Sequence, residues 1–489
     1  MAAAVGGRPA GQMNWQENDP VLDFRGLVRI LEERGELYRI TRPVDPKFEM
    51  PAVMEQIEQQ RKGFIFENVK GASFPVIGGV LNRIECYGWA LGSRPGEPFT
   101  AADLDTRFEA AKLATIPPRE VATGPVKEVV HAAGEINLAD LPVPTVFELD
   151  SGAFITAACG FSRNPNTGNI NVGVYRTLIL GKNIAAVNAS SLSDLRRFYQ
   201  HAEQRGESMP IALAIGVEPA LQMAAACKLP AHLSELDLAG GLQQKAIDLV
   251  KCETNDLLVP ANAEMIIEGR VDFSRKIENT LGEFAGQYGP ETAPVTEVTA
   301  ITHRKDAMFY SILAGKNPEH NTLGSMATFA IQHALADGLR RVLPQIRDIN
   351  VYLDPTFGSM AHIVISIRKK SDAEPMALIE TAFNAAGGFF PVSHITKRIV
   401  VVDDDINVHD LDDVEWAIWS RVAEASKFRV IPNVESWELE RCAKEGRGSL
   451  RLGIDATMDM EDREKLRRPI IPGAGKIRLA DYLDKKSAA

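Results

Sequence analysis

The sequence predicts a multi-domain protein of the α/β class. We expect a small N-terminal α/β lobe, a central domain of strands around a β-barrel-like core, and a C-terminal layered α/β domain. The chain has 489 residues, which is too long for one compact core. Aliphatic and aromatic residues make up 45% and charged residues 24%, as in ordinary globular proteins. Short strands dominate the middle of the chain, whereas helices alternate with apolar strands in its last third.

The N-terminal lobe is expected over residues 15–118. Asp23 can cap the first helix, and Gly35 can end it. Two short strands are predicted at 63–71 and 74–78, where apolar and polar residues alternate between glycines. Two prolines at the end of the lobe interrupt the helical pattern before them, which predicts a boundary there.

The central domain is expected over 119–310 and the C-terminal domain over 311–489. Predicted central strands lie at 154–159, 172–180 and 211–217, with a helix at 192–205. In the last domain, helices at 326–342 and 374–386 alternate with strands at 348–353, 363–367 and 398–402. The tail from 446 onward has weak periodicity, so we expect it to wrap over a neighbouring surface.

The charge balance and the hydropathy exclude several classes of protein. A formal net charge of -11 argues against a nucleic-acid partner, because phosphate neutralisation needs a basic face. No stretch approaches the roughly 20 apolar residues that span a bilayer, and the N-terminus lacks the apolar core of a signal peptide. We therefore expect a cytoplasmic protein with no nucleic-acid and no membrane partner.

Several common catalytic motifs are missing. The five cysteines are scattered without a CxxC pair, so neither a disulfide framework nor a thiolate metal site is indicated. The motifs GxGxxG, GxxxxGK[ST], GxSxG and HExxH do not occur. Their absence disfavours Rossmann, P-loop, α/β-hydrolase and zinc-hydrolase chemistry.

One arginine and two glutamates could act on a carboxylate substrate. Asn171 stands five residues before Arg176, and Glu278 and Glu283 repeat that spacing. A guanidinium can orient a carboxylate, and a tuned carboxyl group can move a proton. Five residues turn a helix by about 140° net, so the glutamates cannot share a helix face, and we expect a glycine-rich loop to bring them together. A surface ion pair and solvated loop glutamates are the commoner alternatives.

Nine short segments, taken in order, resemble the UbiD family of prenylated-FMN-dependent (de)carboxylases from Gly26 to about Leu483. The segments are 66–71, 140–142, 171–176, 216–219, 250–253, 259–264, 268–269, 282–289 and 401–405. The resemblance implies a split β-barrel that binds prenylated FMN through its phosphate and a bridging metal ion. It also implies a C-terminal domain that dimerises, in a homodimer or a hexamer.

The resemblance assigns roles to particular residues. It implies that Arg176, Glu278 and Glu283 are catalytic, with Glu283 as the proton donor, and that Asn171 binds the metal. The cofactor-binding residues that it implies are Asn171, Gly173, Val174, Tyr175, Arg176 and Lys397, the last at the phosphate.

Two positions depart from the usual pattern of the family. The customary metal-binding histidine falls at Asp194, and the customary glutamate falls at Asp248. With Asn171 these residues would form an all-oxygen site, which favours Mg²⁺ or Mn²⁺, with Fe²⁺ as a further option, over zinc. K⁺ nearby is an additional expectation.

The function implied by the family is reversible, non-oxidative decarboxylation of an aromatic, heteroaromatic or α,β-unsaturated carboxylate. The substrate would bond covalently to the modified flavin, which acts as the electron sink, and Glu283 would protonate the same carbon. Phe389, Phe390 and His394 are predicted to face an aromatic ring, with hinge packing as the alternative. His320 is expected to be a structural histidine. A flavin prenyltransferase would supply the cofactor.

Three alternatives stay open. The substrate could be an aromatic acyl-CoA with a ring carboxylate, whose phosphates would meet Arg463, Lys465, Arg467 and Arg468, although a solvated face explains such a run equally well. The protein could instead be a reductase that uses ordinary FMN. It could also be a non-catalytic subunit, since two metal positions differ.

Overall fold

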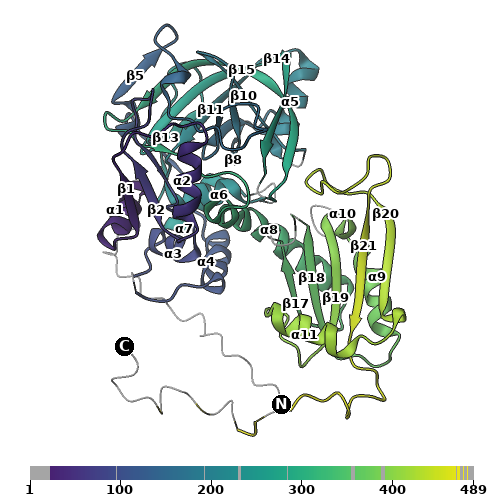
Figure 1. Cartoon of the computed structure of the whole chain (residues 1–489). Coiled ribbons are helices and arrows are strands. Elements are labelled where there is room, and N and C mark those ends of the chain that lie inside the picture. The colour runs from purple at the N-terminus through teal and green to yellow at the C-terminus, as the bar shows by residue number, and fades with distance from the viewer. Residues whose placement is uncertain are drawn as a thin grey trace.

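The chain folds around two main apolar regions, one in the body of the molecule and one in a separate C-terminal sheet (Figure 1). The first unites buried side chains from Phe24 to Met326. The second unites buried side chains from Ile331 to Val401, between one face of the C-terminal sheet and the helices that pack on that face. The computed structural model describes residues 23–94, 96–191, 193–229, 233–283, 285–353, 358, 360–386, 391–469, 471–473, 477 and 482.

The N-terminal part begins with the helix that the sequence predicts. Asp23 accepts a hydrogen bond from the amide of Gly26 at 2.7 Å, and Gly35 follows the helix with φ of +66°. Its elements are α1 (Phe24–Glu33), β1 (Leu37–Ile40), α2 (Glu49–Glu58), β2 (Gly63–Phe66), β3 (Val76–Gly78), α3 (Ile84–Ala90) and α4 (Ala101–Leu113). A later strand, β16 (Phe309–Tyr310), joins β1, β2 and β3 in one sheet, which ties this part to the end of the central region.

A curled antiparallel sheet forms the centre of the body, as the barrel prediction requires. Its strands are β5 (Val129–Ala132), β6 (Phe154–Ile155), β7 (Cys159–Arg163), β8 (Ile170–Val174), β9 (Thr177–Ile179), β10 (Ile184–Val187), β11 (Met209–Ile215), β14 (Met265–Gly282) and β15 (Tyr288–His303). The two longest strands of the described chain, β14 and β15, form a hairpin in which β14 pairs with β11 and β15 pairs with β10.

Helices and a small sheet surround this half-barrel (Figure 1). The helices are α5 (Asp194–Arg205), α6 (Pro219–Ala226) and α7 (Glu235–Gln243), and the sheet consists of β4 (Arg119–Glu120), β12 (Asp248–Lys251) and β13 (Leu258–Pro260). Two of the helices, α5 and α7, begin with an acidic residue after a serine cap. Carboxylates at helix N-termini are stabilised by the helix dipole.

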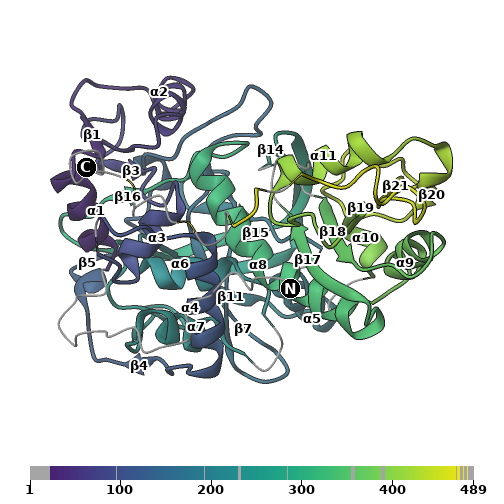
Figure 2. The ribbon, with the colours of Figure 1, turned by 90° about the horizontal axis from the view of Figure 1, so that it is seen from below.

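The long helix α8 (Pro318–Val342) leads from the body to the C-terminal sheet (Figures 1 and 2). The elements that follow are β17 (Ile346–Tyr352), β18 (Ala361–Ile367), α9 (Glu374–Phe383), α10 (Val392–Ile395), β19 (Thr396–Asp403), α11 (Leu411–Arg421), β20 (Phe428–Val434) and β21 (Ser449–Ala456). All seven residues of β18 are buried, as expected for an inner strand with helices on both faces. The predicted α/β class is confirmed. No helix in the described ranges is long and apolar enough to cross a membrane.

Two buried glutamates fix the start of α8. Glu319 accepts hydrogen bonds from the amides of Gly79 at 2.6 Å and Leu81 at 2.7 Å, and Glu58 accepts one from the amide of Glu319 at 2.9 Å. Both side chains are fully buried. Burial raises the pKa of each carboxyl group, and the neighbouring Glu319 raises that of Glu58 further.

This pair makes stability depend on pH. Glutamate in the unfolded chain has a pKa of about 4.3, so above that pH the unfolded chain releases protons that the folded protein keeps. The contribution of the two carboxyl groups to the free energy of unfolding is therefore complete at low pH and is lost as pH rises through the folded pKa values. Glu58→Gln keeps the shape of the protonated glutamate but cannot release a proton. Its melting temperature relative to the unmodified protein should therefore rise by about 2 °C or more between pH 5.5 and 8, as measured by thermal scanning.

The control for this experiment is Glu55→Gln on the exposed face of the same helix. It should show no such trend. A difference between Glu58→Gln and the unmodified protein that stays constant with pH would contradict the account.

Candidate active site

A cavity of about 310 Å³ lies where the central sheet meets α8 and the C-terminal domain. The predicted site residues in its wall are Asn171, Gly173, Val174, Tyr175, Arg176, Asp194 and Glu283. A larger hollow of about 960 Å³ along residues 433–448 contains none of them. The smaller cavity is therefore the candidate site.

Arg176 lies in this cavity beside two carboxylates. It lies in the short connection between β8 and β9, directly before Thr177, and forms ion pairs with Glu283 and, at 3.6 Å, with Glu291 of β15. The side chains of the three residues are 19%, 6% and 17% exposed. Burial lowers the pKa of Arg176, and the charge of Glu291 counteracts this effect, so the guanidinium stays charged. The arrangement is a cation held between two acids in a mostly desolvated pocket.

Glu278 lies elsewhere, and the expected convergence of Glu278 and Glu283 through a loop is wrong. Glu278 is an exposed residue within β14, opposite Thr292, whereas Glu283 follows the last residue of that strand. Successive side chains of a strand point to opposite faces. A spacing of five residues therefore directs Glu278 and Glu283 to opposite faces of the sheet. Glu291 from the partner strand takes the second acidic position beside Arg176.

Glycines around Glu283 allow the close packing that holds it. A Cβ atom on Gly289 would lie 2.8 Å from Cγ and Oε1 of Glu283, and one on Gly282 would lie 2.3 Å from the ring of Phe147. Neither distance is sterically acceptable for a side chain. Gly282 and Gly289 thus allow the close packing that brings the carboxylate of Glu283 against Arg176.

Four polar groups gather at another part of the wall. Asp194 and Glu235 are the first residues of α5 and α7, and Asn171 lies on β8. Lys228 forms an ion pair with Asp194 at 2.9 Å. Burial lowers the pKa of Lys228 to about 8 and raises that of Glu235 to about 7. An amide oxygen and two carboxylates beside an ammonium group can bind a cation or a phosphate.

Asp248 is not part of this group, so its prediction as a metal ligand is wrong. It begins β12 and forms a bidentate ion pair with Arg119, with distances of 2.8 and 2.9 Å. The acidic residue that lines the cavity is Glu235. The local signal for Glu235 is Ser234 followed by an acid, a pattern typical of a capped helix start.

Tyr175 fills the floor of the cavity beside Asn171. Its hydroxyl lies 3.4 Å from Nδ2 of Asn171. Cβ atoms on Gly160 or Gly173 would lie 2.5 and 2.4 Å from the tyrosine side chain. These two glycines are required because the ring rests directly on their backbone.

Residues that the sequence analysis did not assign to the site complete the wall. His320 follows the anchoring Glu319, and its Nδ1 donates to the carbonyl of Gly315 at 3.1 Å. Burial and the charge of Arg176 lower its pKa to about 4, so the imidazole is neutral at pH 7. Trp437 reaches the cavity from the C-terminal domain, and its buried indole N–H has no hydrogen-bond partner in the described ranges.

Two further predicted residues, Lys397 and His394, are not in the cavity wall. Lys397, at the start of β19, pairs with Glu440 and donates to the hydroxyl of Ser449 at 2.5 Å, so its ammonium group is engaged within the C-terminal domain. His394 lies in α10, where its carbonyl accepts from the amide of Trp437 at 3.4 Å. Phe389 and Phe390 lie outside the described residues.

Comparisons with known proteins find domains of one family in three successive parts of the chain. Models of the 3-octaprenyl-4-hydroxybenzoate carboxy-lyase N-terminal, Rift-related and C-terminal domains match residues 28–102, 119–317 and 325–456. An uncharacterized protein of Archaeoglobus fulgidus is 32% identical over 461 residues, which cover 90% of this chain and 92% of that protein. The chain belongs to the UbiD family.

Solved structures of UbiD-class enzymes share the fold. The enzyme HmfF from Pelotomaculum thermopropionicum in complex with FMN has a TM-score of 0.79 and 34% identity, covering 94% of this chain and all of that one. An evolved dimeric form of HmfF in complex with prFMN has a TM-score of 0.75, the same identity and the same coverage. Vanillic acid decarboxylase from Sedimentibacter hydroxybenzoicus has a TM-score of 0.78 at 22% identity, with 96% and 99% coverage, and shows the fold alone.

The residues of the cavity fit a flavin phosphate with a hard cation. The oxygen donors Asn171, Asp194 and Glu235 are ligands typical of Mg²⁺ or Mn²⁺, and Lys228 adds a charge that suits a phosphate. The indole N–H of Trp437, which has no partner among the residues that the structure describes, can donate to a bound molecule. The volume falls at the lower end of small-molecule sites.

The expectation that Asn171, Asp194 and Glu235 bind a divalent cation can be tested directly. Glu235→Gln and Asp194→Asn should each lower the content of bound divalent metal in purified protein by about tenfold or more, since each removes a negative ligand. Asp248→Asn should leave the content unchanged because its partner is Arg119. Elemental analysis of the three variants measures this. Metal lost from Asp248→Asn and kept by Glu235→Gln would contradict the assignment.

Proposed function

We propose that the protein is a carboxy-lyase of the prenylated-FMN-dependent type, acting on an aromatic, heteroaromatic or α,β-unsaturated carboxylate. One observation carries the proposal: Arg176 pairs with Glu283 and Glu291 inside the cavity that also contains Asn171, Asp194 and Glu235. A relative with 34% identity was solved with FMN and with prFMN. This combination supplies a carboxylate clamp, proton carriers and a flavin site in one space.

The cofactor would be held at its charged end by Asn171, Asp194 and Glu235 through a divalent cation, with Lys228 on the phosphate. Lys228 provides a fixed positive charge beside Asp194, and K⁺ nearby stays part of the proposal. When bound, the modified flavin supplies the electron sink that loss of CO₂ from an sp² carbon requires.

The residues of the chain orient the substrate and supply the proton. Arg176 presents two N–H donors that match a carboxylate and holds Glu283 in place. Glu283, buried beside that cation, is proposed to donate the proton to the carbon that loses CO₂. When Glu283 is protonated, ionised Glu291 balances the positive charge of Arg176, so the guanidinium keeps one charged partner.

Apolar residues would close the site against water. Ile331 of α8 and Leu439 of the C-terminal domain line the cavity together with Trp437. The amide of Ser191 donates to Glu438 at 3.0 Å, which connects this segment to the body. A flat indole and two aliphatic side chains suit an aromatic ring, so we propose a free aromatic acid as substrate. The arginines near 463–468, considered for a CoA ester, do not line this cavity.

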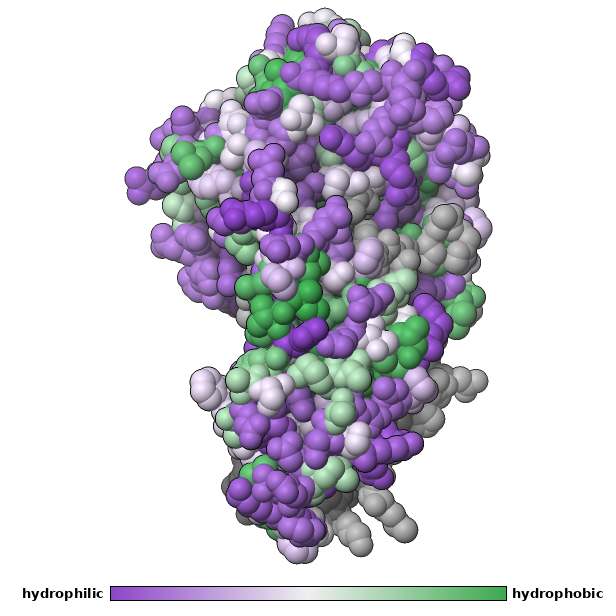
Figure 3. All heavy atoms as spheres, turned by 90° about the vertical axis from the view of Figure 1, so that its right-hand side faces the viewer, coloured by the Kyte–Doolittle hydropathy of each residue, from purple (hydrophilic) through white to green (hydrophobic). Residues whose placement is uncertain are grey.

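We also propose that the protein associates with itself through its C-terminal domain. The side of the molecule shown in Figure 3 is mostly hydrophilic and carries several separate apolar patches. The edge strand β20 contributes the exposed side chains Phe428 and Val430, and β21 contributes Leu450. Exposed apolar residues along an edge strand are typical of an interface.

The experiment on Glu283 tests the proposed chemistry. Glu283→Gln should lower the rate of CO₂ release by about 10² to 10⁴ while the flavin absorbance of the purified protein is retained. The assay uses protein co-expressed with a flavin prenyltransferase and a panel of hydroxybenzoates, methoxybenzoates, cinnamate and five-membered heteroaromatic carboxylates.

The matched control is Glu278→Gln, which changes the exposed glutamate on β14. It should keep at least half of the activity. A near-normal rate for Glu283→Gln, or a loss in Glu278→Gln as large as in Glu283→Gln, would refute the assignment. No release of CO₂ by the unmodified protein from any acid in the panel, together with NADH consumption, would favour an FMN reductase.

A further inference from the structure

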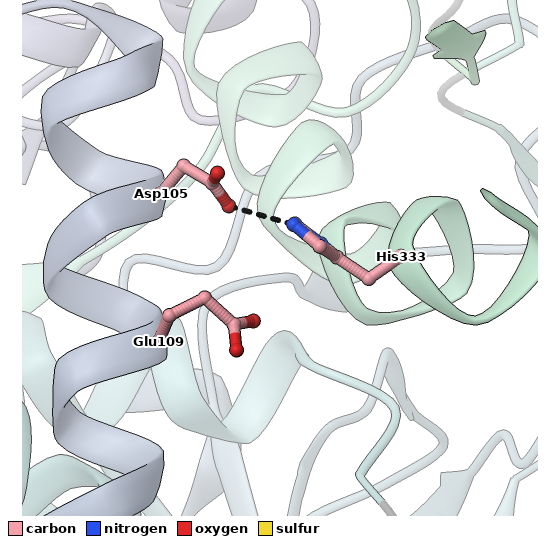
Figure 4. A group of neighbouring side chains, drawn as sticks. All are labelled: Asp105, Glu109 and His333. Carbon is pink, nitrogen blue, oxygen red and sulfur yellow. Dashed lines mark ion pairs between the residues drawn. The ribbon is translucent and has the colours of Figure 1, made fainter. Parts of the chain in front are cut away.

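A histidine and two carboxylates converge at the junction of α4 and α8, outside the cavity. Asp105 and Glu109 lie four residues apart on α4, and His333 lies on α8 (Figure 4). One nitrogen or oxygen atom from each of the three side chains lies within 4.8 Å of the others. Residues four apart share a helix face, so α4 presents both carboxylates to the imidazole.

The imidazole of His333 is oriented toward the carboxylates. Its Nδ1 lies 2.9 Å from the carbonyl oxygen of Phe329, and a carbonyl can only accept, so Nδ1 carries the hydrogen. The other nitrogen, Nε2, lies 2.8 Å from Oδ1 of Asp105. In neutral His333 the lone pair of Nε2 therefore points at the acids. A backbone carbonyl that fixes the tautomer in this way is the usual outer partner of a metal-binding histidine.

We propose that Asp105, Glu109 and His333 bind a divalent transition-metal ion such as Zn²⁺. One imidazole and two carboxylates provide three ligands for a four-coordinate ion, and water would supply the fourth. The side chains of Asp105, Glu109 and His333 are 39%, 43% and 33% exposed, so an ion can reach the site from solvent. The two negative charges match the charge of the ion.

A metal ion would replace two ion pairs of these side chains, one between Lys112 and Glu109 and one between His333 and Asp105. Lys112 pairs with Glu109, with distances of 2.8 and 3.0 Å to its two oxygens. Such partly exposed pairs contribute only about 0–1 kcal/mol. Protonated His333 pairs with Asp105, and a metal ion takes the place of that proton. Binding should therefore release a proton and free the ammonium group of Lys112.

The location gives the ion a structural consequence. Leu335 and Leu339, just beyond His333 on α8, are buried in the core of the C-terminal domain, and Ile331, just before it, lines the cavity. A metal ion on His333 would tie this part of α8 to α4 in the body. It would thus fix the helix that joins the two parts of the molecule.

The test is a titration of the full-length, chelator-treated protein. Equilibrium dialysis with Zn²⁺ and the visible absorbance of bound Co²⁺ should each show one equivalent that His333→Ala lacks. Glu109→Gln should bind that equivalent at least about tenfold more weakly, a loss seen even when only an outer partner of a metal site is removed. Zn²⁺ should raise the melting temperature of the unmodified protein more than that of His333→Ala.

The chain offers a matched control in His409, which pairs with Asp348 at 3.2 Å on the surface of the C-terminal domain. His409→Ala should bind the same number of ions as the unmodified protein, and Asp194→Asn should still bind the ion at His333. Equal stoichiometry and affinity in His333→Ala and the unmodified protein would overturn the proposal. An equal loss in His409→Ala would also overturn it, because binding would then be adventitious.

Discussion

The ion pairs of Arg176 with Glu283 and Glu291 are the interaction on which the site depends. A guanidinium in a desolvated pocket is costly unless acids compensate its charge. The long hairpin of β14 and β15 supplies both acids, Glu283 from the connection after β14 and Glu291 from β15, and the glycines near Glu283 allow its close packing. The long strands and the glycines at their connection are thus the features that place both acids beside Arg176.

A second constraint is the anchoring of α8. Buried Glu319 binds backbone amides of the N-terminal part, and the next residue, His320, reaches the cavity. The same helix continues through Ile331 in the cavity wall to the core of the C-terminal domain. One helix thus links the N-terminal sheet, the site and the second domain. The segment with Trp437 then returns from that domain to the cavity, so the site is shared by both parts of the molecule.

Local signals in the sequence were sufficient for the fold and for part of the site. The cap at Asp23, the strand alternation and the place of Asn171 on a strand depend on neighbouring residues. The strand expected over 172–180 is instead two strands, β8 and β9, with Tyr175 and Arg176 in the connection between them. Geometry across the sheet was not accessible in this way. The spacing of Glu278 and Glu283 excludes a shared helix face, and along a strand the same spacing places the two side chains on opposite faces. Glu291 and the pairing of Lys397 with Glu440 depend on contacts between distant segments.

The central claim is that one cavity contains both the flavin and the acids around Arg176. A crystal structure of the protein co-expressed with a flavin prenyltransferase tests it most directly. The account predicts prenylated FMN with its phosphate near Asn171, Asp194 and Glu235, and with its ring system beneath Arg176 and Glu283. A flavin bound elsewhere, or a cavity that stays without flavin while the protein releases CO₂ from an aromatic acid, would contradict the account.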